Sequence, residues 1–223
     1  MKTTLYRWFA ILWVMLAGGN LLPLAAQVAT PVVATSHTFE LFPVNVLLFR
    51  LINDHYLPAL DPFFAHVGQY AGNGWICLPV TILVYFLLRR QCGVLLFALA
   101  VETAVVQVLK DVCAQWRPGV ILEHVHQIAH LRRGSFPSGD AAMAWVIVCA
   151  LWPASPRWLR VVLACYGVFV VYERVYIGVH FPLDVTAGAL VGILCVLLCT
   201  FILNRATKHP QPSTEPEVNV PVP

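Results

Sequence analysis

About six apolar runs constrain what this chain can fold into, because each is long enough, or nearly so, to cross a hydrocarbon layer as a helix. The chain is 59% hydrophobic and only 11% charged, whereas a soluble domain carries about 25% charged residues. So few charged side chains cannot cover a surface that faces water. The pattern therefore predicts an all-α integral membrane protein. The runs cover residues 6–29, 72–88, 93–109, 138–152, 159–172 and 185–203.

The basic residues predict how such a protein is oriented. With six spans, eight of the 14 Lys and Arg residues fall on one side, which the positive-inside rule makes cytoplasmic. These eight are Lys2, Arg7, Arg89, Arg90, Arg157, Arg160, Arg205 and Lys208. The other six fall outside or at the outer edge, where a bound anion is the natural reason for them. They are Arg50, Lys110, Arg117, Arg132, Arg133 and Arg174.

The chain divides into three predicted parts. Residues 1–36 contain the first apolar run, which is a transmembrane helix or, since "LAAQ" follows a basic start and an apolar core, a signal peptide. Residues 37–205 form the membrane domain. Its first outer loop, residues 37–70, mixes aromatic and charged residues and predicts one or two amphipathic helices in the membrane interface. Residues 206–223 are rich in proline and polar residues and predict a disordered cytoplasmic tail.

Three segments with unusual chemistry meet on the outer side of this arrangement. The first, "KDVCAQWRP", contains Lys110 and Arg117, whose cations suit phosphate oxygens, although each could also be a snorkelling residue at a helix end. The second, "FPSGD", opens a helix with Ser138 as cap and Gly139 beside it. Unpaired N–H groups at a helix N-terminus bind anions, although a cap and turn alone would have the same sequence.

The third segment, "ERVYIGVHFPLD", contains Arg174, then His180 and Asp184 four residues apart. A carboxylate beside an imidazole fixes the tautomer of the ring and stabilises its positive form. This pairing is typical of a histidine that acts as nucleophile or base. In the same span, Gly188 and Gly192 are also four residues apart and predict close packing against a neighbouring helix.

In this order, K-x6-RP, PSG and R-x5-H-x3-D resemble the type 2 phosphatidic acid phosphatase superfamily of membrane lipid phosphatases, over roughly residues 45–203. The resemblance implies a six-helix bundle with an extracytoplasmic site. It also implies a metal-independent reaction through a phosphohistidine, with no cofactor. His180 would attack phosphorus and Asp184 would orient it. The phosphoryl oxygens would be held by Lys110, Arg117, Ser138, Gly139 and Arg174.

Two positions depart from the family pattern. Glu173 replaces a common serine, and we expect it to pair with a nearby base. Asp140 replaces the histidine that acts as general acid on the leaving group. Nearby cations favour an ionised carboxylate, which cannot donate a proton. Three hypotheses remain open for this catalytic position: Asp140 is held protonated, a loop histidine supplies the proton, or the leaving group needs little protonation. The loop histidines are His124, His126 and His130.

The third hypothesis favours a lipid diphosphate, since the departing phosphate monoester is already a weak base. We therefore expect a lipid phosphatase of the plasma (inner) membrane, facing the periplasm or exterior, with undecaprenyl diphosphate as a fitting substrate. Lipid A, phosphatidylglycerol phosphate and phosphatidate remain alternatives, as do a lipid phosphotransferase and a non-catalytic phospholipid-binding protein. The expected partners are the bilayer and a lipid phosphate. The net charge of +3 is too small and scattered to indicate nucleic acid, and no obligate protein partner is evident.

Overall fold

The computed structural model describes residues 39–71, 74–129, 131 and 134–206, and within them all regular structure is helical. The all-α prediction is therefore confirmed for this part of the chain. Each of the last five predicted spans coincides with a helix. The first predicted span and the tail beyond residue 206 lie outside the described residues. The α-helices are α3 Pro43–Asn53, α4 Asp61–Ala71, α5 Cys77–Leu87, α6 Arg89–Cys113, α7 Pro118–Ile121, α8 Gly139–Leu151, α9 Arg157–Tyr176 and α10 Pro182–Ala206.

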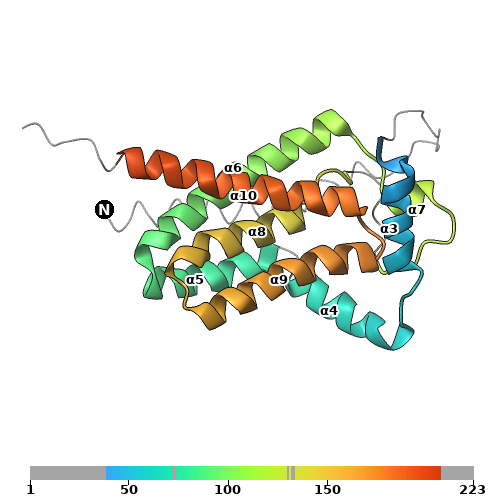
Figure 1. Cartoon of the computed structure of the whole chain (residues 1–223), viewed down its shortest axis with the longest axis horizontal. Coiled ribbons are helices and arrows are strands. Elements are labelled where there is room, and N and C mark those ends of the chain that lie inside the picture. Colours follow the sequence, from blue (N-terminus) through green and yellow to red (C-terminus); the bar gives the residue numbers. More distant parts are fainter. Residues whose placement is uncertain (1–38, 72–73, 130, 132–133, 207–223) are drawn as a thin grey trace, which may run out of the picture.

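Helix α8 is the centre of the bundle and packs against α6, α9 and α10 (Figure 1). Nine of its 13 residues are buried, and they lie on every side of the helix. A helix that is apolar all round must be surrounded, since it has no polar face to turn outward. Four of the buried residues are alanines, whose small side chains let neighbouring backbones come close.

The pairing of α8 with α10 depends on two glycines. A Cβ at Gly188 would collide with the backbone carbonyl of Ser138, and one at Gly192 with the carbonyl of Ala142. Any side chain at either position would push the helices apart. The close packing predicted from their four-residue spacing is confirmed, and it holds the N-terminus of α8 against that of α10.

The outer surface of the bundle is apolar. Exposed large side chains follow the outward faces of α6, α9 and α10, as in Val108, Val161 and Leu194. Patches of this extent are rare on soluble monomers and fit a lipid environment. Among the described residues, two helices are long and apolar enough to cross a membrane, Gln91–Cys113 with mean hydropathy 2.2 and Pro182–Ala206 with mean hydropathy 2.6. Shorter apolar helices accompany them at Pro43–Asn53, Gly74–Leu87 and Gly139–Ala154.

The predicted functional segments gather at one end of the bundle. The end of α6, the start of α8, the end of α9 and the start of α10 meet there, and α3 runs across the same end (Figure 1). Helix α3 contacts α9 and α10. The basic residues Arg89, Arg157 and Arg205 lie at the other ends of α6, α9 and α10. The alternation expected from the sequence therefore holds for these helices.

Candidate active site

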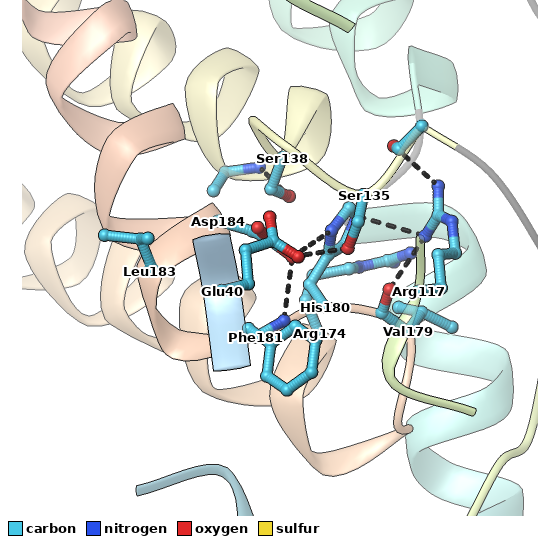
Figure 2. Close-up of polar contacts among 12 residues, drawn as sticks. Glu40, Arg117, Ser135, Ser138, Arg174, Val179, His180, Phe181, Leu183 and Asp184 are labelled. Atoms are coloured by element: carbon cyan, nitrogen blue, oxygen red, sulfur yellow. Dashed lines mark hydrogen bonds and ion pairs between the residues drawn. The ribbon is translucent and has the colours of Figure 1, made fainter. Parts of the chain in front are cut away.

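His180 and Asp184 form a buried pair at the start of α10. His180 lies in the short turn between α9 and α10, and Asp184 lies in the first turn of α10. The distance from His180 Nδ1 to Asp184 Oδ2 is 3.3 Å, and the two residues are 2% and 0% exposed. Asp184 Oδ2 also accepts hydrogen bonds from Ser135 Oγ at 2.6 Å and from the Phe181 N–H at 2.8 Å (Figure 2). These donors fix the carboxylate, which in turn orients the imidazole.

The contacts of His180 define which ring nitrogen can react. Nδ1–H donates to Asp184, and Arg117 Nη1 donates to Nε2 at 3.2 Å. Nε2 is therefore the nitrogen with the lone pair. Burial, together with the charge of Arg117, lowers the pKa of His180 to about 4, against the opposing influence of Asp184. A neutral imidazole with its lone pair on Nε2 is the form that a nucleophile requires.

Arg117 and Lys110 bring positive charge to this nitrogen. Arg117 also donates to the carbonyls of Val179 at 3.0 Å and Gly134 at 3.3 Å, which hold its guanidinium beside His180 (Figure 2). Burial lowers the pKa of Arg117 to about 10, which still leaves it charged at neutral pH. Lys110, near the end of α6, is close enough to interact electrostatically with Arg117, Asp140 and Asp184.

Ser138 and Gly139 join the start of α8 to the same cluster. The Ser138 N–H donates to the carbonyl of Asp184 at 3.0 Å, which ties the two helix starts together. Ser138 Oγ accepts a hydrogen bond from the Ala141 N–H at 3.4 Å, so the predicted cap is present. A Cβ at Gly139 would meet only Val106 Cγ1 at 3.5 Å, an ordinary contact. Packing therefore does not require glycine here.

Arg174 is bound by the two residues that depart from the family pattern. Its Nη1 lies 3.0 Å from Asp140 Oδ2, and its Nε lies 2.7 Å from Glu173 Oε2. Its Nη2 donates to the carbonyl of Gly68 at 2.6 Å. The expected pairing of Glu173 with a nearby base is confirmed. Asp140 is ion-paired and its side chain keeps 30% exposure, so the geometry does not favour the hypothesis of a protonated Asp140.

A family model described as the PAP2 superfamily matches residues 91–208, more than half of the chain. The chain belongs to this superfamily. An undecaprenyl-diphosphatase of Sulfolobus acidocaldarius is 34% identical over 151 residues, which cover 66% of this chain and 73% of that protein. This membership confirms the expected class of enzyme, a phosphatase.

Two solved structures resemble the fold. The structure of Aquifex aeolicus LpxE has a TM-score of 0.71 and 40% sequence identity, and the match covers 74% of this chain and 99% of that chain. A transmembrane PAP2-type phosphatidylglycerolphosphate phosphatase from Bacillus subtilis has a TM-score of 0.62 at 19% identity, over 92% of this chain and 98% of that chain. The second likeness concerns the fold alone. Together with the apolar surface, the comparisons identify a membrane protein.

The described histidines of the loop before α8 make their contacts away from His180, Asp184 and Asp140. His126 Nε2 is 3.1 Å from Asp61 Oδ1, and its ring stacks on Tyr56 at a centroid distance of 3.7 Å. His124 is exposed and has a φ of 53°. His130, like Arg132 and Arg133, lies outside the described residues. Neither described histidine has a recorded contact with His180 or Asp140, so the hypothesis of a loop proton donor gains no support from the described part.

Sequence reasoning did not select two residues that contact Asp184. Ser135 stands three residues before Ser138 in the PAP2 motif region and donates the shortest of the hydrogen bonds to the carboxylate. Glu40 is fully buried beside Asp184 (Figure 2). The only sign of Glu40 in the sequence is an acid within the apolar stretch "TFELF", and the mixed composition of this region predicts an interfacial helix.

Among the described residues, no group of three His, Cys, Asp or Glu side chains could hold a metal ion. The polar groups at the site are instead two basic side chains near His180, an ion-paired Arg174 and the start of α8. This set suits an anion with several oxygens.

Proposed function

We propose that this PAP2 phosphatase hydrolyses a lipid diphosphate, with a polyprenyl diphosphate such as undecaprenyl diphosphate as the favoured substrate. The reaction proceeds through a phosphohistidine at His180 and takes place on the extracytoplasmic face of the plasma (inner) membrane. The observation that supports the nucleophile is the pair of contacts on His180, with Nδ1–H held by Asp184 and Nε2 directed at Arg117.

In the first step the lone pair of His180 Nε2 attacks the terminal phosphorus as the bond from phosphorus to the bridging oxygen breaks. That oxygen keeps the bonding electrons and leaves as the lipid monophosphate. Asp184 stabilises the positive charge that develops on the imidazole. Water then attacks the phosphohistidine, so that inorganic phosphate departs and Nε2 recovers its lone pair. One diphosphate and one water give one lipid monophosphate and one phosphate.

Positive charge at the site stabilises the transferring phosphoryl group. Arg117 Nη1 lies 3.2 Å from His180 Nε2, and Lys110 interacts electrostatically with Asp184. The start of α8 adds the backbone N–H of Gly139, since the N–H of Ser138 already donates to the Asp184 carbonyl. Arg174 contributes to the same field while it holds Asp140, and a phosphoryl oxygen can replace that carboxylate as its partner.

The ion pair between Asp140 and Arg174 supports a diphosphate over a simple phosphate ester. A carboxylate that accepts from a guanidinium has no proton for the leaving group. An alkoxide, a strong base, would leave slowly from such a site, whereas a phosphate monoester leaves without a proton. The 34% identical undecaprenyl-diphosphatase supports the same choice.

The distribution of basic residues supports the outer location. Arg89, Arg157 and Arg205 mark one end of the bundle, and the site lies at the other end. Basic residues flanking spans favour the cytoplasm. The site then faces the periplasm or exterior.

A substrate panel tests the proposal. Purified protein in detergent is given undecaprenyl diphosphate, lipid A, phosphatidylglycerol phosphate, phosphatidate and a simple alkyl phosphate, and free phosphate is measured. We expect a preference for the diphosphate of at least tenfold in kcat/KM. Equal or faster hydrolysis of the alkyl phosphate would contradict the diphosphate assignment.

Two variants separate the chemical steps. His180→Ala should abolish phosphate release. Asp140→Asn should retain it within about tenfold, because Asp140 does not act as a general acid in the proposed mechanism. Loss of a general acid would lower the rate by about 10²–10⁴-fold. Label that moves to an acceptor lipid would indicate phosphotransfer, and binding without turnover would indicate a binding protein. Activity should persist in buffer with a chelator, and its loss there would contradict the phosphohistidine route.

A further inference from the structure

Glu40 lies in a segment whose burial is the reverse of what its residue types favour. Phe39 and Leu41 are 49% and 43% exposed, while Glu40 between them is 0% exposed. A carboxyl group is buried only where it is compensated or neutral, since an isolated buried charge is very costly. The apolar neighbours face outward and the acid faces the site, so the conformation of this segment places one carboxyl group beside Asp184.

The position of Glu40 is set by Asn45 in α3. The Asn45 side chain donates to the Glu40 carbonyl at 2.8 Å and accepts from the Leu183 N–H at 2.9 Å. One buried amide therefore joins the backbone of Glu40 to the first turn of α10, next to Asp184. Figure 2 shows the side chains of Glu40 and Asp184 side by side.

Asp184 Oδ1 gains a hydrogen-bond donor from its neighbour Glu40 only if Glu40 holds a proton. Asp184 Oδ2 has its donors, but Asp184 Oδ1 and both oxygens of Glu40 have no partner among the described residues when both groups are ionised. The pair lies within hydrogen-bonding contact. Two buried carboxylates in contact repel each other, so one must hold a proton. Asp184 already accepts from Ser135, Phe181 and His180, which stabilise its charge. Glu40 has no such donors within the described part of the chain.

We infer that Glu40 is a protonated positioning residue that donates a hydrogen bond to Asp184 Oδ1 and so extends the His180–Asp184 pair to a chain of three groups. Every oxygen of Asp184 is then satisfied, which fixes its rotation and keeps its charge shared among four donors. The neutral form also adds no negative charge beside an anionic substrate.

Electrostatics around Glu40 agree with this assignment. Burial, followed by the contact with Asp184, raises the pKa of Glu40 to about 10. Cys113 raises it further, and the charge of Arg117 lowers it. Because the pKa is raised, the proton stays on Glu40 from neutral pH up to about pH 10 and is lost above it.

The inference rests on the proposed role of His180 and is tested with two substitutions at one position. Glu40→Gln keeps the shape and a donor N–H for Asp184 Oδ1. Glu40→Leu keeps the bulk and removes the donor. Glu123→Gln is the control, since Glu123 is an exposed acid in the loop before α8. Each purified variant is assayed for kcat, KM and the pH dependence of kcat/KM with undecaprenyl diphosphate.

We expect Glu40→Gln and the control to stay within about threefold of the unmodified enzyme. Glu40→Leu should lower kcat by about 10–100-fold, as loss of an outer partner of a catalytic group does, with KM within threefold. Its acid limb should also move to higher pH. With one donor lost, Asp184 stabilises the protonated form of His180 more strongly and so raises its pKa. The charges of Arg117 and Lys110 continue to oppose this protonation.

Other results overturn the inference. If Glu40 were ionised, Glu40→Gln would remove a negative charge and lower KM for the anionic substrate severalfold. Unmodified kinetics in Glu40→Leu, or equal loss in both variants, would leave no role for the donated proton. If Glu40→Leu does not fold, as judged by size exclusion in detergent, the KM of Glu40→Gln alone decides. Activity that survives in His180→Ala would instead refute the proposed nucleophile.

Discussion

Replacing Asp140 with histidine should extend hydrolysis to simple alkyl phosphates. In the unmodified enzyme Asp140 Oδ2 lies 3.0 Å from Arg174 Nη1. Two unit charges at that separation attract by about 1.4 kcal/mol in water and by about 5.5 kcal/mol at an effective dielectric constant of 20. The half-buried ion pair lies between these limits, so the attraction that holds Asp140 as the partner of Arg174 is about one to several kcal/mol. The carboxylate is therefore a poor general acid.

The size of the gain follows from the two leaving groups. An alkoxide is a strong base, close to hydroxide in basicity, whereas the second pKa of a phosphate monoester is about 6. A positioned general acid contributes about 10²–10⁴-fold where the leaving group needs a proton. Since Asp140→His also breaks the ion pair with Arg174, we expect the lower part of that range. The ratio of kcat/KM for the alkyl phosphate over the diphosphate should rise by about 10²-fold.

The assay measures phosphate release from both substrates by the unmodified enzyme, Asp140→His and Asp140→Asn. The asparagine variant loses the charge without gaining an acid, so it isolates the effect of releasing Arg174. A ratio for Asp140→His within twofold of that for Asp140→Asn, in folded protein, would refute the reasoning. So would an unmodified enzyme that already prefers alkyl phosphates.

Three further changes test packing, charge state and loop anchoring. Gly192→Ala should lower the melting temperature by several degrees, because overpacking costs about 1–3 kcal/mol, whereas Gly93→Ala, whose Cβ would meet nothing within 4 Å, should not. The pKa of His180 is lowered, so its neutral form persists until the pH falls to about 4. We therefore expect kcat/KM, corrected for substrate ionisation, to keep its value down to about pH 5. An acid limb at pH 6.5 would contradict this. Asn53→Leu should lower the melting temperature by about 5 °C or more, because it leaves buried backbone groups unpaired; an unchanged value would show that water replaces the amide.

Hydropathy predicted the last five spans well but placed the ends of three of them, at residues 109, 172 and 203, too early. Helix α9 continues past the predicted end at residue 172 to Tyr176, and so carries Glu173 and Arg174 inside its last turn. Both residues are buried, because each neutralises the other and Arg174 also binds Asp140 and Gly68. A hydropathy scale treats a charged residue as the end of a span. It has no means of recognising a charge that is paired within the bundle.

The motif residues were predictable for a different reason. His180 and Asp184 are four residues apart, so local geometry alone brings them together. Glu40 is 144 positions away from Asp184 in the chain. The side-chain amide of Asn45 holds the backbone of Glu40 beside the first turn of α10, next to Asp184. No spacing or composition signals such a contact, and the apolar residues around Glu40 favoured a location in the membrane interface. Long-range partners of a catalytic group become visible only when the fold is known.

The two departures from the family pattern have one structural explanation, because Asp140 and Glu173 bind the same guanidinium. A serine at 173 and a histidine at 140 would leave Arg174 without either carboxylate. Here two negative charges flank it, so less of its field reaches the phosphoryl site than its position suggests. In the proposed mechanism, Lys110 and Arg117 then carry most of the attraction for the transferring group. Arg174 therefore stabilises the negative charge on the leaving group only weakly. This weak stabilisation favours a substrate whose leaving group already carries its charge well, as a phosphate monoester does.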